Sequence, residues 1–445
     1  MATTLNAAQE NELLKADRAA VVDAMSNLTF AATDCWLGAA HKAVLGVEKE
    51  HQPTGADALS SADLAEYLAV AAPTHCADGW GYLSRALQAY LVGDAHSAWH
   101  FGYYAELRAA QSILSASGCG AFDKWNCVLD ATGAVHVLPG RLPTHVMVWL
   151  ALRCLAERAP SASASIAVAT RLLGESIPDI IQYAYPGRGT SATSSNWINE
   201  WLFDLETSSD DKSFRNRCSY NPHLATPHHA SIPDCVEWIC SLWQALLPSP
   251  GAAFMEVDKH IVRAVLKREA LQSLSLHGST ANIPPIAVEA ELRAAYSRVL
   301  ASAPTFASIP MDFISNVNDA DHPLLIYARE DATNPSTPRP VLARATLLLR
   351  IATGTTHNLL RDADQRDQLD FWLDGLAMRQ GLVSDKLEIP QDRADFYLDC
   401  AVAAEDFESL YKNGHATRAK LMGHAKTKIH LLAQAERVIQ WGFTS

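Results

Sequence analysis

The feature that most constrains the fold of this chain is a helical repeat of apolar residues that continues along most of its 445 residues. Apolar side chains recur at spacings of three and four, on a background of Ala, Leu, Glu and Arg, which favour helices. Hydrophobic residues make up 49% of the chain, enough to bury a large core. We therefore predict an all-α protein, a multi-helix bundle. Helices are expected at 7–26, 61–71, 79–91, 96–115, 143–158, 163–174, 195–205, 233–247, 253–275, 288–301, 340–352, 364–380, 393–412 and 417–441.

One segment departs from the helical repeat. Residues 124–138 carry β-branched and aromatic side chains on both sides of Asp130-Ala-Thr-Gly133. This composition is typical of two short strands joined by a tight turn. We predict one small β-hairpin insert near residues 124–138, which must lean on the helices because an isolated hairpin is only marginally stable.

The strongest break in the helical pattern is Leu247-Pro-Ser-Pro-Gly251. Two prolines and a glycine end the preceding helix and favour a linker. We predict a domain boundary here, with a helical domain at 1–247 that includes the hairpin and a C-terminal helical domain at 252–445. A second run of prolines, at 334–340, is expected to separate helices within the second domain.

Charge and composition limit the partners of the chain. The formal net charge is -13, so any contact with nucleic acid must be local. The nine cysteines are spread along apolar helical segments and are expected to be reduced. The first residues lack the pattern of a signal peptide, and the most apolar stretches contain arginines and are too short to span a bilayer. We expect a cytoplasmic protein without membrane contact.

Two segments about a hundred residues apart carry the clearest functional signal. The first is Tyr103-Tyr-Ala105, on a predicted helix that ends near Gly118. The second is Arg215-Asn-Arg-Cys-Ser-Tyr220, a polar stretch placed to meet that helix. Together they resemble the HEPN superfamily, whose members are all-α bundles that often bind or cut RNA. The resemblance covers about residues 80–245.

The resemblance implies a site for RNA or a nucleotide. Ribonuclease members of the superfamily carry an Arg followed, after four to six residues, by a His, and Arg217 with His223 has this spacing. In such a pair a guanidinium holds the scissile phosphate and an imidazole moves protons, without a metal or other cofactor. Arg215, Asn216 and Tyr220 are the expected substrate-binding residues. The resemblance thus implies a metal-independent endoribonuclease of a phage-defence or stress system, acting as a homodimer.

Other interpretations stay open on the sequence. The same Arg and His spacing occurs at Arg350 with His357 and at Arg418 with His424, so only the position of Arg217 after the tyrosine helix favours that pair. One alternative is a non-catalytic helical scaffold, or an accessory subunit of a protein complex, in which the Arg-rich stretch is structural. Another is a small-molecule enzyme that uses His96 and His100 with nearby acids, Asp94 and Glu106.

Several further residues have a simpler structural interpretation. Arg344 and Arg350 lie on an otherwise apolar predicted helix, and we expect their guanidiniums to pair with acids of neighbouring helices. Cys235 and Cys240 lack the spacing of a zinc knuckle and are expected in the core. Cys218, beside two arginines, is a weak candidate nucleophile.

Overall fold

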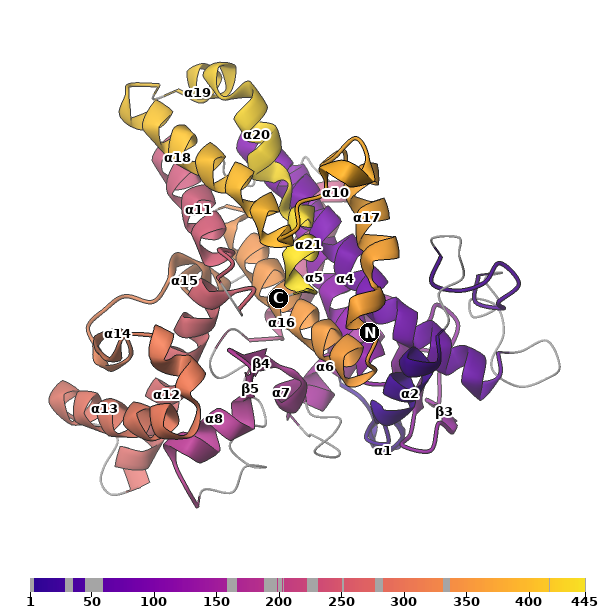
Figure 1. Ribbon diagram of the computed structural model, residues 1–445. Helices are drawn as coiled ribbons and strands as arrows, with labels where there is room; N and C mark the ends of the chain where they lie inside the picture. Colours follow the sequence, from indigo (N-terminus) through magenta and orange to yellow (C-terminus); the bar gives the residue numbers. More distant parts are fainter. Residues whose placement is uncertain are drawn as a thin grey trace.

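A computed structural model describes residues 4–28, 35–44, 59–157, 166–187, 198, 202, 204–221, 231–249, 252–276, 283–330, 337–415 and 417–444. Regular structure in these ranges is almost entirely helical, with one three-stranded and one two-stranded sheet (Figure 1). The predicted all-α class with a small β insert is confirmed. Within the same ranges, no helix combines the length and the apolar character needed to cross a lipid bilayer.

The part before the predicted boundary contains the small sheets and the two longest N-terminal helices. Its elements are α1 (Ala7–Leu13), α2 (Ala19–Asn27), α4 (Ser61–Val92), α5 (Ala95–Ala116), β1 (Cys119–Ala121), β2 (Asn126–Leu129), β3 (Val135–Val137), α6 (Thr144–Glu157), α7 (Ile166–Ala169), β4 (Arg171–Leu172), β5 (Glu175–Ser176), α8 (Ile177–Ala184), α10 (Thr207–Tyr220) and α11 (Ile232–Ala245).

The regular structure of the part after the boundary is all helical within its described residues. Its elements are α12 (Met255–Leu276), α13 (Pro285–Ser302), η4 (Pro304–Ser308), α14 (Met311–Ser315), α15 (Pro323–Ala328), α16 (Arg339–Asp362), η5 (Arg366–Gln368), α17 (Asp370–Arg379), η6 (Lys386–Glu388), η7 (Arg393–Tyr397), α18 (Leu398–Lys412), α19 (Arg418–His424), α20 (Lys426–Ala433), η8 (Ala435–Arg437) and α21 (Val438–Gly442), where η marks a 3₁₀ helix.

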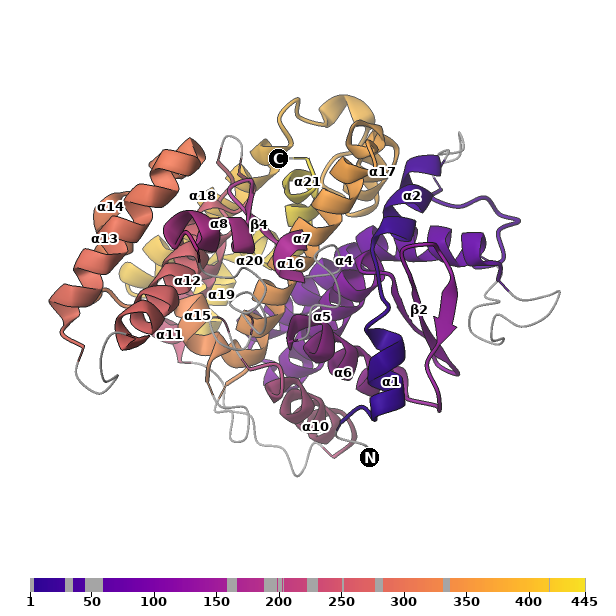
Figure 2. The ribbon, with the colours of Figure 1, turned by 90° about the horizontal axis from the view of Figure 1, so that it is seen from below.

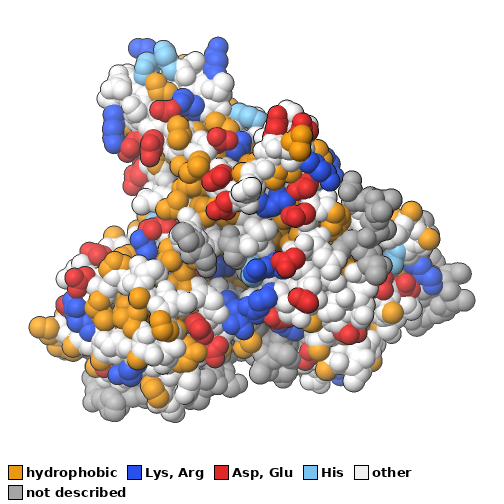
Figure 3. Space-filling model, in the orientation of Figure 1, with side chains coloured by type: hydrophobic (Ala, Val, Ile, Leu, Met, Phe, Trp, Pro, Cys, Tyr) orange, Lys and Arg blue, Asp and Glu red, His pale blue; other side chains and the backbone are white. Residues whose placement is uncertain are grey.

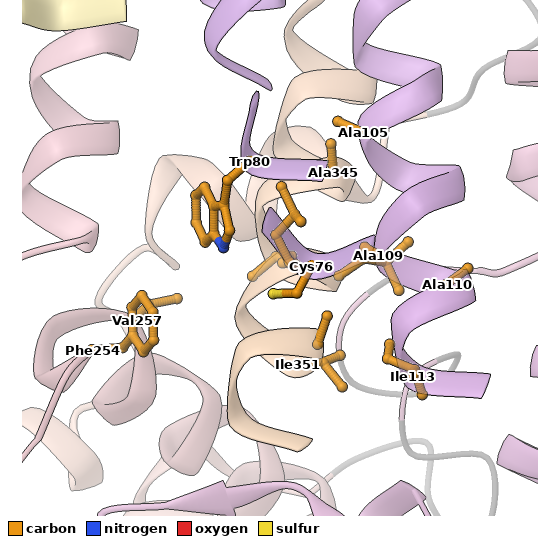
Figure 4. Packing of buried hydrophobic residues seen from close by; sticks show 14 of the residues in the cluster. Cys76, Trp80, Ala105, Ala109, Ala110, Ile113, Phe254, Val257, Ala345 and Ile351 are labelled. Atoms are coloured by element: carbon orange, nitrogen blue, oxygen red, sulfur yellow. The ribbon is translucent and has the colours of Figure 1, made fainter. Parts of the chain in front are cut away.

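Three long helices, α4, α5 and α16, form the centre of the molecule (Figures 1 and 4). Small residues let them approach closely. A Cβ atom added to Gly79 of α4 would lie 2.6 Å from the Leu349 side chain of α16, and one added to Gly102 of α5 would lie 3.1 Å from Val341. The Trp80 indole also donates a hydrogen bond to the Thr353 hydroxyl (3.0 Å). This packing places α16 directly against the two N-terminal helices.

Helix α4 continues through Pro73, where we expected a break between residues 71 and 79. Proline removes a backbone donor from a helix interior. Carbonyls beside this position keep partners, because the Thr74 hydroxyl donates to Val70 (2.8 Å) and Ser112 of α5 donates to the carbonyl of Ala72 (2.7 Å). Tertiary packing of a buried helix therefore overrides the local signal, and the expected break is wrong.

The predicted hairpin is present as β2 and β3, which pair antiparallel with Val128 opposite His136. Strand β1, just before the predicted segment, adds a third strand with Cys119 opposite Val128. Helices α1 and α2 lie beside this sheet, on the side of the molecule away from α13 (Figure 2). The amide of Asp17, between α1 and α2, donates to the carbonyl of Leu129 (2.9 Å) and ties the two layers together.

The described residues on the two sides of 248–251 share one hydrophobic core. Helix α16 packs on α4 and α5, and α20 and η8 pack on α4. Phe254 and Val257 of the C-terminal part lie near Trp80 and Cys76 of α4 (Figure 4). The boundary at 248–251 stays a prediction about the chain, but this packing indicates that the two parts stabilise one another.

We expect the full chain to unfold in one cooperative transition, and residues 1–247 produced alone to lose cooperative unfolding. The reason is that the isolated part exposes the apolar faces of α4 and α5 that α16 covers. Thermal melting followed by circular dichroism on both proteins measures this. A cooperative transition of residues 1–247 near the melting temperature of the full chain would instead establish an independent domain.

Candidate nucleic-acid interface

Helix α5 carries the first motif. It begins after Asp94, whose carboxylate accepts a hydrogen bond from the Ser97 amide (3.0 Å). Tyr103 is buried and Tyr104 half-buried on its surface. Gly118, in the left-handed conformation with φ +82°, follows the helix end and sets the direction of the chain into β1, as the sequence indicated.

The second motif lies on α10, a helix that we did not predict because most of its residues are polar. Its buried side is narrow: Phe214 packs on Trp99 of α5, with ring centroids 4.7 Å apart, and Cys218 is buried one turn later. The Arg215 guanidinium carbon lies 4.9 Å from the ring centroid of Tyr103 and 5.1 Å from that of Tyr104. The two motifs therefore meet in space.

The structure places the predicted site residues of α10 at different depths. Arg215 is buried beneath the surface, whereas Asn216 is half-buried and Arg217 exposed. Tyr220, at the end of the helix, has 72% of its surface exposed. His223 lies outside the described residues, so its pairing with Arg217 stays a prediction.

Arg215 is an unusual cation because it is buried without a counter-charge. Only 4% of its surface is exposed, and no carboxylate of the described residues lies within ion-pair distance. Its Nε atom is buried and has no hydrogen-bond partner within those residues. The faces of two tyrosines offset part of the desolvation cost. Burial and then the charge of Arg215 lower the pKa of Lys212, one turn earlier on the exposed side.

Two histidines border the same arginine. The His100 Nδ1 atom lies 2.7 Å from the Ser219 hydroxyl, and the His145 Nδ1 atom lies 3.3 Å from the Tyr103 hydroxyl. Burial, and then the charge of Arg215, lower the pKa of both imidazoles below the usual value. Both rings are therefore neutral at neutral pH, and each neutral ring can donate one hydrogen bond and accept another.

The acids nearest to Arg215 along the helices have another partner. Asp211, one turn before Arg215, receives two hydrogen bonds from the Arg344 guanidinium of α16 (2.6 and 2.9 Å). Glu106, one turn after Tyr103, lies 3.4 Å from the same guanidinium. All three side chains are buried. The expected pairing of Arg344 with acids is confirmed, and it leaves Arg215 without a neutralising carboxylate in the part of the chain that the structure describes.

The alternative histidine site is not assembled. Asp94 caps α5 and interacts with His96, whereas Glu106 is buried against Arg344, so the two acids do not share one site with His96 and His100. Across the ranges that the structure describes, no group of three or more His, Cys, Asp or Glu side chains is arranged to hold a metal.

The cysteines that the sequence singled out, Cys218, Cys235 and Cys240, pack against the core. Cys235 is buried in α11, and the Cys240 thiol donates to the carbonyl of Ala404 in α18 (3.6 Å). Burial raises the pKa of Cys218 to about 11, so its thiolate is scarce at neutral pH and it is a poor nucleophile.

Sequence reasoning missed Lys212 and His145. Lys212 lies three residues before Arg215, so a helical interpretation of 207–220 would have placed both cations on neighbouring positions. The apolar pair Phe214 and Cys218, four residues apart, was the signal for that helix. His145 comes from α6, and no local pattern connects it to α10.

No protein-family model matches the chain, and the comparisons with curated proteins and with solved structures found no similar protein. The HEPN resemblance of the two motifs stays a prediction from the sequence.

Proposed function

We propose that the chain binds RNA through the surface made by α5 and α10, called here the α5–α10 face. It consists of His100, Lys212, Asn216, Arg217 and Tyr220, with Arg215 buried directly beneath them. The observation that carries the proposal is Arg215, a buried guanidinium without a carboxylate partner in the described part of the chain. A phosphate of the ligand would supply the missing negative charge.

The exposed end of α10 supports a chain-like rather than a compact ligand. Arg217 and Tyr220 are three residues apart and lie next to each other on the helix surface. A cation beside an exposed aromatic ring is the combination that proteins use for single-stranded nucleic acid, where the cation contacts phosphate and a base stacks on the ring. The net charge of -13 makes such a local site necessary.

Binding of a fluorescent oligouridylate of about 20 nucleotides, measured by anisotropy, tests the proposal. We expect Arg217→Gln to weaken binding about fivefold. We also expect it to reduce the slope of log affinity against log salt concentration by about one. We expect Tyr220→Ala to weaken binding about tenfold through lost stacking.

Matched controls lie far from this face on η6. Lys386→Gln removes an exposed cation, and Leu387→Ala removes a side chain that is 94% exposed. Both should bind as the unaltered protein does. Binding that is independent of salt, or equal in all four variants, would contradict the proposal.

The finer proposal, cleavage by Arg217 and His223, rests on the HEPN resemblance. If Arg217 holds phosphate and His223 transfers protons, Arg217→Ala and His223→Ala should abolish RNA cleavage in the presence of chelator while leaving the melting temperature nearly unchanged. Sedimentation should then show a homodimer. RNA binding without cleavage would support a binding protein, and neither activity would support the scaffold alternative.

A further inference from the structure

A second basic site surrounds a cavity of about 540 Å³, which is formed by other elements than the α5–α10 face. The β4–β5 turn, the start of α12, the second half of α16 and the residues after α21 enclose it. Lys and Arg side chains gather near the centre of the face shown in Figure 3, where Figure 1 places β4 and α16. We call this cavity the arginine pocket; its polar lining is Arg171, Asp258, Arg350, His357, Asn358, Arg361, Arg366 and Thr444.

Helix α16 supplies most of this lining from one face. Arg350, Gly354, His357 and Arg361 follow at spacings of four, three and four, which places them on one stripe of a helix. Gly354 leaves room for its neighbour, because a Cβ atom there would lie 2.6 Å from Nη1 of Arg350. The stripe therefore directs two guanidiniums and an imidazole into one cavity.

The arginines outnumber the acids around them. Arg350 forms a bidentate ion pair with Asp258 of α12, with both distances 2.7 Å. Arg361 pairs with Asp362 (2.8 Å), which also binds Arg18 of the N-terminal part (2.7 Å). These contacts confirm the expected acid partner of Arg350 and leave one shared acid for Arg361.

The remaining two arginines have no carboxylate partner among the described residues. Arg171 donates to the carbonyl of Gly174 in the turn (2.8 Å), and Arg366 is exposed at the pocket rim. The pocket thus presents positive charge that the rest of the described protein does not neutralise.

His357 and Phe254 line the part of the pocket that would contact the organic part of a ligand. The Nδ1 atom of His357 donates to the carbonyl of Phe443 (3.0 Å), which leaves Nε2 as an acceptor. Burial, with three pocket arginines adding to it, lowers the pKa of His357 to about 4, so the ring stays neutral. Phe254, Leu173 and two alanines supply the apolar part of the lining, and the Arg350 guanidinium carbon lies 4.9 Å from the Phe254 ring centroid.

We propose that the arginine pocket binds a small organic phosphate of the size of a nucleoside mono- or diphosphate. The phosphate lies among Arg171, Arg361 and Arg366, the apolar part of the ligand lies on the Phe254 wall, and a ligand hydroxyl donates to Nε2 of His357. The cavity volume is within the range of small-molecule sites. This ligand site is separate from the α5–α10 face and does not depend on RNA binding there.

Calorimetric titration of the full chain with ADP, AMP, inorganic phosphate and adenosine tests the proposal. We expect ADP to bind most tightly and adenosine to be at least about tenfold weaker, because it lacks the charge that the arginines recognise. Arg366→Gln should weaken ADP binding about fivefold, and Arg361→Gln with Arg366→Gln about fiftyfold. Melting temperatures of the ligand-free variants should stay close to that of the unaltered protein, because Arg366 makes no ion pair in the described residues and the Arg361–Asp362 pair is at the surface, where an ion pair contributes little.

The matched control is Arg379→Gln, an exposed arginine at the end of α17 outside the pocket, which should bind ADP normally. Absence of ADP, AMP and phosphate binding at about 1 mM ligand would overturn the proposal. So would unchanged ADP affinity in the double variant, or equal affinity for adenosine. If inorganic phosphate bound as tightly as ADP, the proposal that the pocket also recognises the organic part of the ligand would be overturned. Oligouridylate binding should be unchanged in the pocket variants, which separates this site from the α5–α10 face.

Discussion

Replacing Arg344 by methionine is expected to lower the free energy of unfolding by about 3–5 kcal/mol, because the change leaves a charged carboxylate buried without its cation. Arg344 lies in the centre of the α4, α5 and α16 packing, with 1% of its surface exposed. It is bidentate to Asp211, which is fully buried. Urea denaturation of the variant measures the loss.

Two further variants identify the origin of that loss. Adding Asp211→Asn to Arg344→Met removes the orphan charge, so the double variant should be more stable than Arg344→Met alone. Glu106→Gln should change stability by less than about 1 kcal/mol at low pH, because Glu106 keeps its shape and holds a proton in the folded protein. A double variant no more stable than Arg344→Met would show that the loss comes from packing instead.

The protonated state of Glu106 has a consequence for pH. Burial, and then the nearby charge of Asp211, raise the pKa of Glu106 well above the usual value, while Arg344 acts in the opposite direction. Its Oε2 atom is buried without a partner among the described residues, whereas Asp211 receives both strong hydrogen bonds and carries the charge. The folded state thus binds a proton that the unfolded state releases near pH 4.5.

The stabilisation that Glu106 contributes is therefore fully present below that pH, and it is lost as the pH rises towards the pKa of Glu106 in the folded state. Glu106→Gln should remove this part of the decline. Glu436, whose pKa burial raises to about 7, adds a decline of the same sign that the variant retains. A pH series of urea denaturation on both proteins measures the difference, and identical slopes would mean that Glu106 is ionised in the folded state.

The long periodic segments were the part of the fold that the sequence could predict. Helices α5, α6, α11 and α12 begin and end within a few residues of the predicted ranges. The hairpin at 124–138 was found through its turn residues, but β1 was not, because three residues after a glycine carry no periodicity. Helix α10 was missed because a mostly polar helix has little apolar periodicity and can be recognised only from the elements that it packs against.

The candidate sites were less predictable than the helices. The Arg and His spacing gave three pairs of equal merit, and sequence position favoured Arg217 with His223. The structure directs Arg350 and His357 into one cavity, together with Arg366 of η5 and with Arg171 of β4, which is distant in sequence. The stripe of Arg350, Gly354, His357 and Arg361 was visible as a helical spacing, but only the fold brings Arg171 and Asp258 to it.

Gly118 gives the second large effect that we expect from a single substitution. Its φ of +82° lies in the left-handed region, and a Cβ atom there would lie 2.4 Å from the backbone oxygen of Asp17. That oxygen cannot move freely, because the Asp17 amide donates to Leu129 (2.9 Å) and the Leu129 amide donates to Gly118 (2.8 Å). Gly118→Ala must therefore displace the junction of α1, α5 and β2.

Gly381 provides the matched control, because it also follows a helix, has φ +68° and has open space where a Cβ atom would lie, with no described neighbour within 4 Å. Each glycine amide donates to the carbonyl three residues earlier, at 3.1 Å for Gly118 and 3.0 Å for Gly381. Gly381→Ala should cost about 1–2 kcal/mol, which is the cost of the left-handed conformation alone. Gly118→Ala should cost about 2–5 kcal/mol, since overpacking adds about 1–3 kcal/mol. Urea denaturation of both variants gives the difference, and equal losses would mean that the Asp17 segment shifts without cost and does not hold the sheet against the helices.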